Sequence, residues 1–330
     1  MQMIRPVGII GTGKYLPEKM LTNQELEKLV DTNDEWIISR TGIKERRIAA
    51  SHQATSDLAY EAALEALKNA GISANQLGLI IVCTMTADVV CPATACLIQE
   101  RLGAKRAAAY DLSAACSGFM YGLANGANFV ATHIYDYVLV IGAEVLSRIT
   151  DYSDRNTCIL FGDGAGAVVL GPTEMNRGIQ AIELGADGSG GALLRGGCVG
   201  GSRYPTADLL PEGVTHHIWQ NGREVFKFAV RVIETVTENL LNKAKIQKSD
   251  IKLLVPHQAN IRIIQLAMEK LELTENEVMI NIDRYGNISA ATIPIALAEA
   301  VEQGRVKQGD TLMLIGFGGG LTWGGAVLTW

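Results

Sequence analysis

The feature that most constrains this chain is an internal repeat, in which segments of the first half recur in the second half at nearly constant spacing. Residues 67–86 (LKNAGISANQLGLIIVCTMT) align without gaps to residues 241–260 (LNKAKIQKSDIKLLVPHQAN), an offset of 174. YVLVIGAEV from Tyr137 aligns to TLMLIGFGG from Thr311 at the same offset, and YDLSAACSG from Tyr110 lies over IDRYGNISA at an offset of 172. Short apolar matches arise by chance, but three in the same order at nearly one offset indicate a duplicated unit.

Each copy of the repeat alternates apolar runs, typical of buried strands, with helical patterns. Residues 174–213 are rich in glycine and carry the weakest pattern, so they are predicted to hold the junction and loops. We therefore expect two α/β halves, residues 1–173 and 174–330, with mixed sheets that contain much parallel pairing. In the first copy, strands are predicted at residues 7–13 and 79–84, and helices at 22–30, 34–38, 56–71 and 92–102.

Composition argues against several classes of function. Apolar residues make up 48% of the 330 residues and charged residues 19%, which favours a large core. The net charge of −6 and the lack of a long Lys/Arg run argue against nucleic acid as a partner. Neither a bilayer-spanning run nor an export signal is recognised, so no membrane is expected and the predicted location is the cytoplasm. The six cysteines form no CxxC pair and no zinc spacing, so we interpret them as reduced thiols and predict no metal.

One stretch of the first copy, residues 106–130, has the pattern of a strand, a tight turn and a buried helix, with Cys116 at the helix start. A helix N-terminus carries unpaired N–H groups and a partial positive charge. Such a site favours the thiolate and can lower a cysteine pKa from about 8.5 to roughly 3.5–7.5. Cys116 is therefore a candidate nucleophile. The alternative is a small apolar residue that fills the core.

The repeat also predicts which residues of the second copy meet Cys116. His257 follows the strand IKLLVP as Cys83 follows its counterpart, and Asn287 occupies the junction that corresponds to that of Cys116. Because duplicated halves usually face each other, the matched strand ends are expected to converge on one site. The glycines at 318–320 end another strand and let a backbone N–H approach a ligand closely. Taken singly, His257 has the alternative of a structural histidine, and Asn287 that of a turn or N-cap residue.

Six segments carry a resemblance to a known family over almost the whole chain. In chain order they are DEWIISRTGI (34–43), the Cys116 stretch, DRNTCILFGDGAGA (154–167), VPHQANIR (255–262), YGNISAAT (285–292) and FGGGLTWG (317–324). With these motifs the chain resembles the beta-ketoacyl-acyl-carrier-protein synthase III family, the enzymes that start type II fatty-acid synthesis. Several independent motifs in the right order make the match specific.

The resemblance implies a thiolase-like fold, a duplicated αβαβα layered sandwich that works as a homodimer. Cys116 would attack the thioester of a short acyl-CoA and hold the acyl group while CoA leaves. The N–H groups of Cys116 and Gly319 would form the oxyanion hole. His257 and Asn287 would stabilise the enolate that forms as malonyl-acyl-carrier protein loses CO2, giving a 3-ketoacyl-carrier protein. No metal or organic cofactor is implied, since CoA enters only as the thioester of the substrate.

The same resemblance implies where the substrates bind. Cys91 stands where many members place a phenylalanine that caps the acyl pocket across the dimer, so we predict a primer larger than acetyl, such as a branched one. Arg223 stands where many members have Asn. By position, Trp36, Arg40 and Arg155 would hold the nucleotide of CoA, Phe226, Ala259 and Asn260 would line the pantetheine tunnel, and Lys227, Gln258 and Arg262 would receive the acidic carrier protein.

Rival functions differ from this one in features that the sequence carries. A papain-like protease uses Cys, His and Asn in the same order, and His257 lies 141 residues after Cys116, inside that family's range. The chain has a duplicated α/β pattern instead of a CGSCW-like segment, which argues against the protease. A degradative thiolase needs a second active-site cysteine near the C-terminus, where the last cysteine is Cys198. The open alternative is a related condensing enzyme of secondary metabolism with a different acyl primer.

Overall fold

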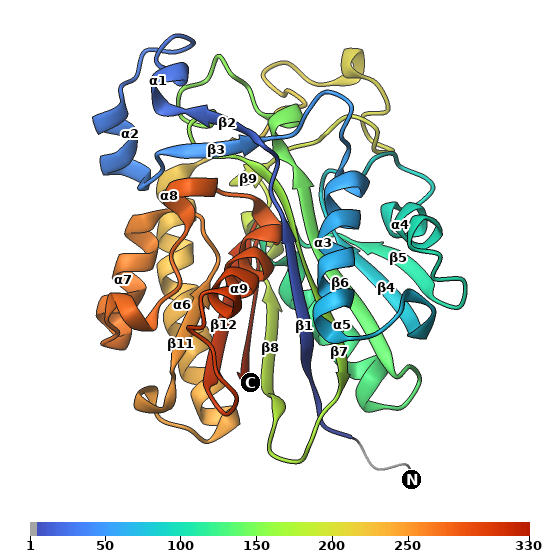
Figure 1. Ribbon diagram of the computed structural model, residues 1–330. Coiled ribbons are helices and arrows are strands. Elements are labelled where there is room, and N and C mark those ends of the chain that lie inside the picture. Colours follow the sequence, from blue (N-terminus) through green and yellow to red (C-terminus); the bar gives the residue numbers. More distant parts are fainter. Residues whose placement is uncertain (1–4) are drawn as a thin grey trace.

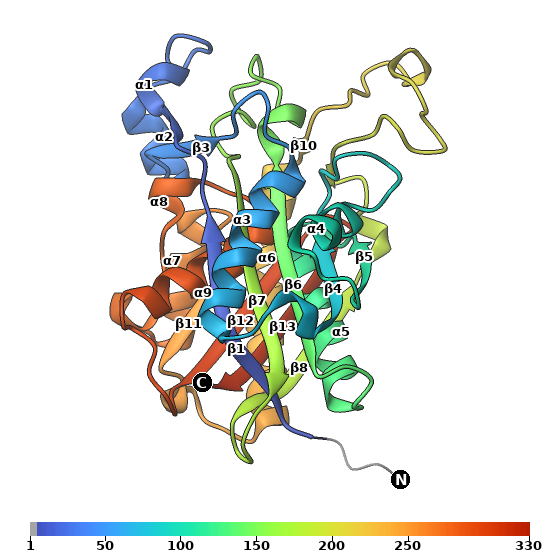
Figure 2. The ribbon, with the colours of Figure 1, turned by 45° about the vertical axis from the view of Figure 1, so that its right-hand side comes forward.

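The computed structural model describes residues 5–330, which fold into five layers of helix, sheet, helix, sheet and helix. This is the duplicated αβαβα sandwich that the sequence predicts. Figure 1 shows the two sheets side by side with helices between and outside them, and Figure 2 shows the same layers after a rotation of 45°.

The first sheet contains β1 (Val7–Tyr15), β4 (Leu77–Cys83), β5 (Ala108–Leu112), β6 (Tyr137–Val145) and β7 (Asp163–Pro172). Their spatial order is β1-β7-β6-β4-β5. β4 pairs parallel with both β5 and β6, whereas β7 pairs antiparallel with β1 and β6. The carboxyl ends of three neighbouring strands therefore meet at one edge of this sheet.

The second sheet contains β8 (Gly178–Ala186), β11 (Leu253–Pro256), β12 (Thr311–Gly318) and β13 (Thr322–Thr329). Their spatial order is β11-β12-β13-β8, with parallel pairing between β11 and β12 and antiparallel pairing elsewhere. The strands of the first sheet thus lie within residues 7–172 and those of the second within 178–329, which supports our proposal of two halves that divide near residue 173.

Helices form the other three layers. α3 (Thr55–Ala70) covers β1, β6 and β7 on one outer side, and α6 (Gly222–Ala244) covers β8, β12 and β13 on the other. α5 (Gly118–Ala131) and α9 (Thr292–Glu302) lie between the sheets. The remaining helices and strands are α1 (Asn23–Leu26), α2 (Asp34–Thr41), α4 (Thr94–Leu102), α7 (Ile261–Leu271), α8 (Ile282–Tyr285), β2 (Lys19–Thr22), β3 (Glu45–Ile48), β9 (Leu194–Arg195) and β10 (Trp219–Gln220).

The two central helices have the composition that burial between two sheets requires. α5 has no charged residue, and Phe119, Met120 and Leu123 are fully buried on it. α9 contributes Ile293, Ala296 and Leu297 to the same core cluster. Helices with so few charged side chains are suited to burial between two sheets, so these two segments fix the central layer.

Two sequence predictions about secondary structure need correction. Thr22 does cap a helix with a capping box, but this helix ends at Leu26 rather than near residue 30. Residues 174–213 were expected to hold the junction and some loops, and within them residues 178–186 form the edge strand β8 of the second sheet, which was not predicted. Glycines and a charged residue interrupt its apolar pattern, because an edge strand is only half covered.

The described residues include no helix with the length and apolar character that crossing a membrane requires.

Candidate active site

Two short 3₁₀ turns, residues 115–117 and 289–291, form the centre of the site and are related by the offset of 174 residues. Each turn leads directly into one of the central helices, α5 or α9. The first residues of the two turns, Ala115 and Ser289, have the same left-handed φ of 47°. Residues other than glycine rarely adopt this conformation, so the duplication has preserved an unusual backbone at the point where both turns meet.

This offset corrects one sequence prediction. Aligned at 172, Asn287 appeared to correspond to the Cys116 junction, but the turns pair Cys116 with Ala290 and Asn287 with Ser113. The alignment at 172 is therefore wrong by two positions at the turn. Before this turn, the second copy has α8 in place of a full strand. The correspondence of His257 with Cys83 at the offset of 174 agrees with the strands. Cys83 is the last residue of β4, and His257 directly follows β11, the matching strand of the second copy.

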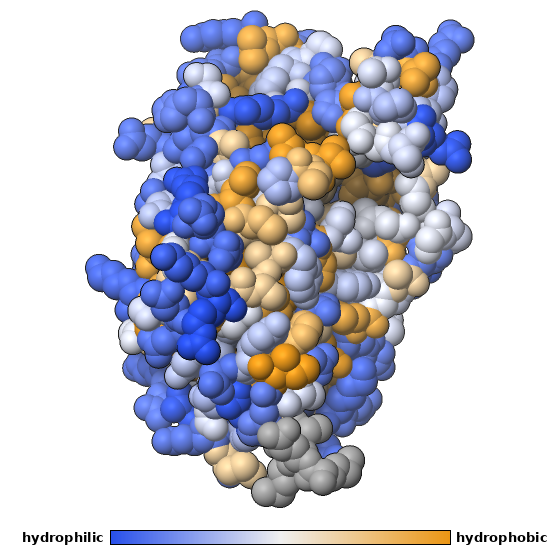
Figure 3. Space-filling model, turned by 90° about the vertical axis from the view of Figure 1, so that its right-hand side faces the viewer, coloured by the Kyte–Doolittle hydropathy of each residue, from blue (hydrophilic) through white to orange (hydrophobic). Residues whose placement is uncertain are grey.

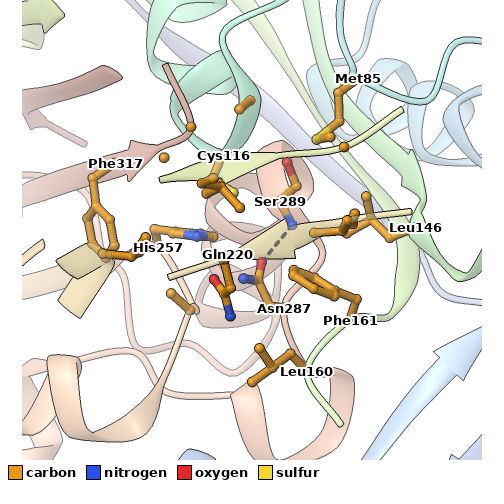
Figure 4. A pocket seen from close by; sticks show the side chains of 18 of the residues that line it. Met85, Cys116, Leu146, Leu160, Phe161, Gln220, His257, Asn287, Ser289 and Phe317 are labelled. Carbon is orange, nitrogen blue, oxygen red and sulfur yellow. Dashed lines mark hydrogen bonds between the residues drawn. The ribbon is translucent and has the colours of Figure 1, made fainter. Parts of the chain in front are cut away.

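A cavity of about 310 Å³ beside the first turn brings the predicted catalytic side chains together (Figure 4). Cys116, His257 and Asn287 all line it, and Gly318 and Gly319 form part of its wall. The size is at the lower end for small-molecule sites. Apolar side chains make up much of the remaining lining, among them Met85, Leu146, Leu160, Phe161, Val225, Phe226 and Phe317.

Cys116 lies in the turn just before α5, as predicted, but its thiol is not in a solvated helix-end environment. The residue is 7% exposed, and burial raises the pKa of the thiol to about 12. A hydrogen-bonding effect of the Ser289 hydroxyl opposes that rise, and the charge of Glu144 adds to it. The lowering of the pKa that a helix start can produce is therefore not found for Cys116, because desolvation outweighs the helix terminus.

His257 is held by Thr292, a residue that the sequence analysis did not single out. His257 Nδ1 and Thr292 Oγ1 are 2.6 Å apart, and the Thr292 hydroxyl donates to the Ser289 carbonyl at 3.1 Å. Because the single hydroxyl proton is used there, Thr292 accepts from Nδ1–H, and Nε2 is left as an acceptor. Burial lowers the pKa of His257 to about 3, so the ring is neutral at pH 7.

Asn287 has its side-chain orientation fixed by the second turn. Its Oδ1 accepts from the Ser289 N–H at 2.9 Å, the contact drawn as a dashed line in Figure 4. Since Oδ1 is used in this way, the amide nitrogen is the end that faces the cavity as a donor. The backbone is fixed as well, because Asn287 N–H donates to the Leu160 carbonyl at 2.8 Å.

The glycine run at the end of β12 lies directly against Cys116. A Cβ added at Gly318 would be 2.7 Å from the Cys116 nitrogen and 2.8 Å from its Cβ, so only glycine fits. This close approach also brings the backbone of Gly319 to the cavity wall. The role of the Cys116 and Gly319 N–H groups as an oxyanion hole stays a prediction, which this packing supports.

Side chains predicted to hold CoA cluster at one edge of the cavity. The guanidinium carbons of Arg40 and Arg155 lie 5.9 and 5.2 Å from the ring centroid of Trp36. Asn260 lines the cavity, and its Nδ2 donates to the Arg40 carbonyl at 3.0 Å, which ties this cluster to the cavity. Phe226 and Ala259 also line the cavity, as predicted for a pantetheine tunnel.

The residues predicted to receive a carrier protein separate into two groups. Lys227 and Arg262 are exposed; Lys227 pairs with Glu224 at 2.7 Å, and Arg262 lies over the Phe226 ring at 5.9 Å. Gln258 is only 1% exposed and donates to the carbonyls at positions 256 and 279, at 2.8 and 3.0 Å. This burial corrects the prediction for Gln258, because a side chain bonded inside the fold offers nothing to a docking protein.

The predicted acyl-pocket residue Cys91 does not reach the cavity within one chain. It is exposed, on the loop before α4, and is not among the cavity-lining residues. Its predicted role requires a second subunit. Gln220, by contrast, lines the cavity, although the sequence analysis did not single it out. The one sequence feature that could have indicated this residue is its position two residues before the start of α6.

Residues 5–330 contain no group of three His, Cys, Asp or Glu side chains arranged to hold a metal ion.

Comparison with known proteins agrees with this architecture. A sequence profile described as 3-oxoacyl-[acyl-carrier-protein (ACP)] synthase III matches residues 110–188, and the profile of its C-terminal part matches residues 241–330. A crystal structure of beta-ketoacyl-[acyl carrier protein] synthase III from Thermus thermophilus superimposes with a TM-score of 0.92 at 48% identity, covering 98% of this chain and 99% of that one. The priming beta-ketosynthase of the R1128 polyketide pathway gives a TM-score of 0.93 at 33% identity, over 100% and 97% of the two chains.

These structures place the chain in the thiolase-like class of condensing enzymes, which are acyltransferases. The protein named beta-ketoacyl-[acyl-carrier-protein] synthase III from Desulfitobacterium hafniense is 54% identical over 98% of both chains. The chain belongs to the beta-ketoacyl-[acyl-carrier-protein] synthase III family.

Proposed function

We propose that this protein condenses a short acyl-CoA with malonyl-acyl-carrier protein, releasing CoA and CO2 and giving 3-ketoacyl-acyl-carrier protein. The observation that carries the proposal is the single cavity lined by Cys116, His257 and Asn287. A thiol, an imidazole and an amide donor are the groups that acyl transfer followed by enolate stabilisation requires. The identity of 54% to a named synthase III supports the same reaction.

In the first half-reaction, the Cys116 sulfur attacks the thioester carbonyl and the acyl group is transferred to it. The oxyanion that forms would be held by the N–H groups of Cys116 and Gly319, and a donor of this kind is typically worth about 3–4 kcal/mol. CoA then leaves, and the acyl group stays on the enzyme as a thioester. This is ping-pong chemistry, in which the first product departs before the second substrate reacts.

In the second half-reaction, malonyl-acyl-carrier protein loses CO2 and the resulting enolate attacks the acyl-cysteine. The Asn287 amide nitrogen faces the cavity and would donate to the enolate oxygen. His257 would donate from Nε2, which needs the tautomer in which the Thr292 hydroxyl turns to donate to Nδ1. The low pKa of His257 suits this role, because a neutral ring donates without adding a buried positive charge.

The substrates would enter along the residues that surround the cavity. Trp36, with the guanidinium groups of Arg40 and Arg155 near its ring, would stack on the adenine of CoA, while the two guanidinium groups attract its phosphates. Phe226, Ala259 and Asn260 would line the path of the pantetheine arm. The exposed Lys227 and Arg262 would meet the acidic carrier protein. The reaction needs no metal or organic cofactor, since the cysteine provides the covalent step.

The protein would act as a homodimer, formed through the face that carries β5. This strand is the edge of the first sheet, with β4 as its partner in the chain, so its outer side offers unpaired backbone groups. Figure 3 shows apolar side chains gathered along this side of the molecule. Val90 is 85% exposed, next to Cys91 on the loop before α4. A second subunit would cover this loop and bring Cys91 to its acyl pocket.

Mixing the protein with acetyl-, isobutyryl- and hexanoyl-CoA and measuring its intact mass tests the proposal. We expect an added acyl mass that is absent in Cys116→Ser, with isobutyryl or hexanoyl loaded more heavily than acetyl. No adduct from any acyl-CoA would contradict the proposed reaction. A strong preference for acetyl would leave the reaction standing and contradict the larger primer. A primer outside this set would favour the alternative of a condensing enzyme of secondary metabolism, which the likeness to a polyketide-priming synthase supports.

A further inference from the structure

Glu144 is a buried carboxyl group that the reaction described above does not use. It lies near the end of β6 and is fully buried. Thr86 Oγ1 donates to its Oε2 at 2.6 Å, and Thr84 Oγ1 and the Met85 N–H donate at 3.2 Å. Among the described residues, no Lys or Arg is a principal influence on its pKa. A carboxyl group buried without a cation is costly, which calls for a functional explanation.

The duplication explains why Glu144 lies near the nucleophile. At the offset of 174 its counterpart is Gly318, and the strand end that carries Gly318 contacts the first turn. The end of β6 passes the second turn in the same way, since a Cβ added at Gly142 would be 2.3 Å from the Ala290 carbonyl oxygen. Side chains two apart on a strand point to the same face, so Glu144 points toward the second turn.

Ser289, the first residue of the second turn, influences the pKa of both Glu144 and Cys116. It is 1% exposed, and its Oγ has no hydrogen-bond partner among the described residues. Burial raises the pKa of both the Cys116 thiol and the Glu144 carboxyl group, and the Ser289 hydroxyl opposes that rise in each. Figure 4 shows the Ser289 side chain beside Cys116. A buried hydroxyl that is not otherwise bonded, next to a thiol and a carboxyl group, is suited to pass a proton between them.

We propose that Ser289 and Glu144 form a proton relay for the acylation of Cys116, an inference that rests on the proposed function. As Sγ attacks the thioester carbonyl, the S–H bond breaks. Ser289 Oγ takes that proton and passes its own to Glu144. The bond from Sγ to the acyl carbon forms, the bond from that carbon to the CoA sulfur breaks, and the relay returns the proton to the CoA sulfur. Glu144 ends ionised again and acts as a positioning residue through Ser289, without touching substrate.

The charges around the thiol favour Glu144 over His257 as the proton acceptor. Burial raises the pKa of Glu144 to about 7, whereas it lowers that of His257 to about 3. The negative charge of Glu144 raises the pKa of two thiols, that of Cys116 and that of Cys83 on β4. Moving the thiol proton to Glu144 therefore leaves one buried negative charge instead of two, which lowers the cost of forming the thiolate.

Acyl loading of the full-length protein, followed by rapid quenching and intact mass from pH 5.5 to 8.5, tests the relay. In the wild type we expect the loading rate to rise with pH around a midpoint near 7, because the ionised carboxylate is the acceptor. Glu144→Gln and Ser289→Ala should each slow loading at pH 8 by about 10²-fold and remove the midpoint. The double variant should be no slower than either single variant, because both act in one pathway.

Matched controls separate the relay from a structural role. Asp163→Asn removes another fully buried carboxyl group, on β7, and Thr150→Ala removes a buried hydroxyl that is bonded to the Leu146 carbonyl and does not line the cavity. Both should keep the wild-type pH profile. A folded Glu144→Gln or Ser289→Ala with the wild-type rate and profile would overturn the relay alone. If the wild type takes up no acyl group from any thioester, the proposed function fails, and the relay with it.

Discussion

The two halves of the molecule share one frame and differ at the strand that leads into the active-site turn. In the first half, β5 is a complete fifth strand that ends at Leu112, three residues before the turn that holds Cys116. In the second half, the corresponding segment forms only an isolated bridge between Val278 and Leu254, and α8 follows it. The full strand forms the edge of its sheet, whereas the shortened segment is followed by a helix.

Corresponding positions in the two halves carry different chemistry. Cys116 corresponds to Ala290 and His257 to Cys83, which is fully buried and has a raised pKa. In each pair, one half supplies a side chain that lines the cavity and that we propose takes part in the reaction, and the other supplies a small residue of the core. The fold that the two halves share therefore determines where the turns and strand ends meet. The different side chains at equivalent positions then give a single site instead of two identical ones.

The largest loss is expected when the His257 imidazole is removed, because position 257 then carries a side chain with no hydrogen-bonding group, and the two halves no longer differ there in their chemistry. We expect His257→Ala to lower condensation by about 10²–10³-fold, since one donor to the enolate oxygen is lost. Acyl loading of Cys116 should stay within a few-fold of the wild type, because a histidine with a pKa of about 3 is a poor acceptor for the thiol proton. Separate assays of loading and of condensation measure the two effects.

Cys83→Ala is the matched control for that variant, since Cys83 occupies the equivalent position and its thiol is buried under α5. It should keep both half-reactions and lose some stability from a small cavity. Equal losses of loading and condensation in His257→Ala would contradict the division of roles between the two half-reactions.

Gly318 provides the next test, because its counterpart Glu144, at the equivalent position near the end of β6, carries a large side chain. A Cβ at Gly318 would be 2.7 Å from the Cys116 nitrogen, so the turn or strand must move. We expect Gly318→Ala to slow acyl loading by about tenfold to a hundredfold and to cost roughly 1–3 kcal/mol of stability from overpacking. Thermal unfolding and the loading assay check the two parts.

Gly188→Ala is the control, since nothing lies within 4 Å of a Cβ built there. It should change neither quantity by much. If Gly318→Ala loads at the wild-type rate, the geometry between β12 and the first turn does not limit acylation.

Much of the fold was predictable because the repeated segments share the same pattern of apolar residues. The offset of 174 between residues 67–86 and 241–260 relates β4 to β11 and the 3₁₀ turns to each other. β8 was missed because edge strands carry little apolar signal, and the true counterpart of Asn287 was missed because a two-residue slip precedes the turn. A sequence reports which segments are buried more directly than it reports register.

The site was predictable where a residue type is chemically distinctive and not where it acts through another. Cys116, His257 and Asn287 were candidates from their chemistry and place in the repeat, and all three line the cavity. Thr292 and Ser289 lie in the motif YGNISAAT, but nothing in the letters says which hydroxyl faces the histidine. Glu144 had one usable signal, a charged residue inside the apolar strand YVLVIGAEV. The pKa of Cys116 could not be predicted from the sequence, because desolvation, which raises it, depends on packing that the sequence does not give.

A smaller change is expected from a substitution at the surface of the second half, where α6 begins beside the cavity. Lys227 is exposed and already paired with Glu224, so replacing it removes only part of a screened charge. We expect Lys227→Ala to raise KM for malonyl-acyl-carrier protein about two- to fivefold at low salt, with kcat unchanged. The effect should shrink as salt increases, because exposed charges are screened.

Lys243→Ala, near the other end of α6, removes an equally exposed lysine that pairs with Glu183 and should leave KM unchanged. Because both variants lower the net charge by the same amount, a difference between them reports position and not total charge. If the two raise KM equally, the carrier protein is attracted by overall charge, and the start of α6 is not its docking surface. A rise that Lys227→Ala alone produces, and that salt abolishes, would tie carrier-protein recognition to the half that also supplies His257 and Asn287.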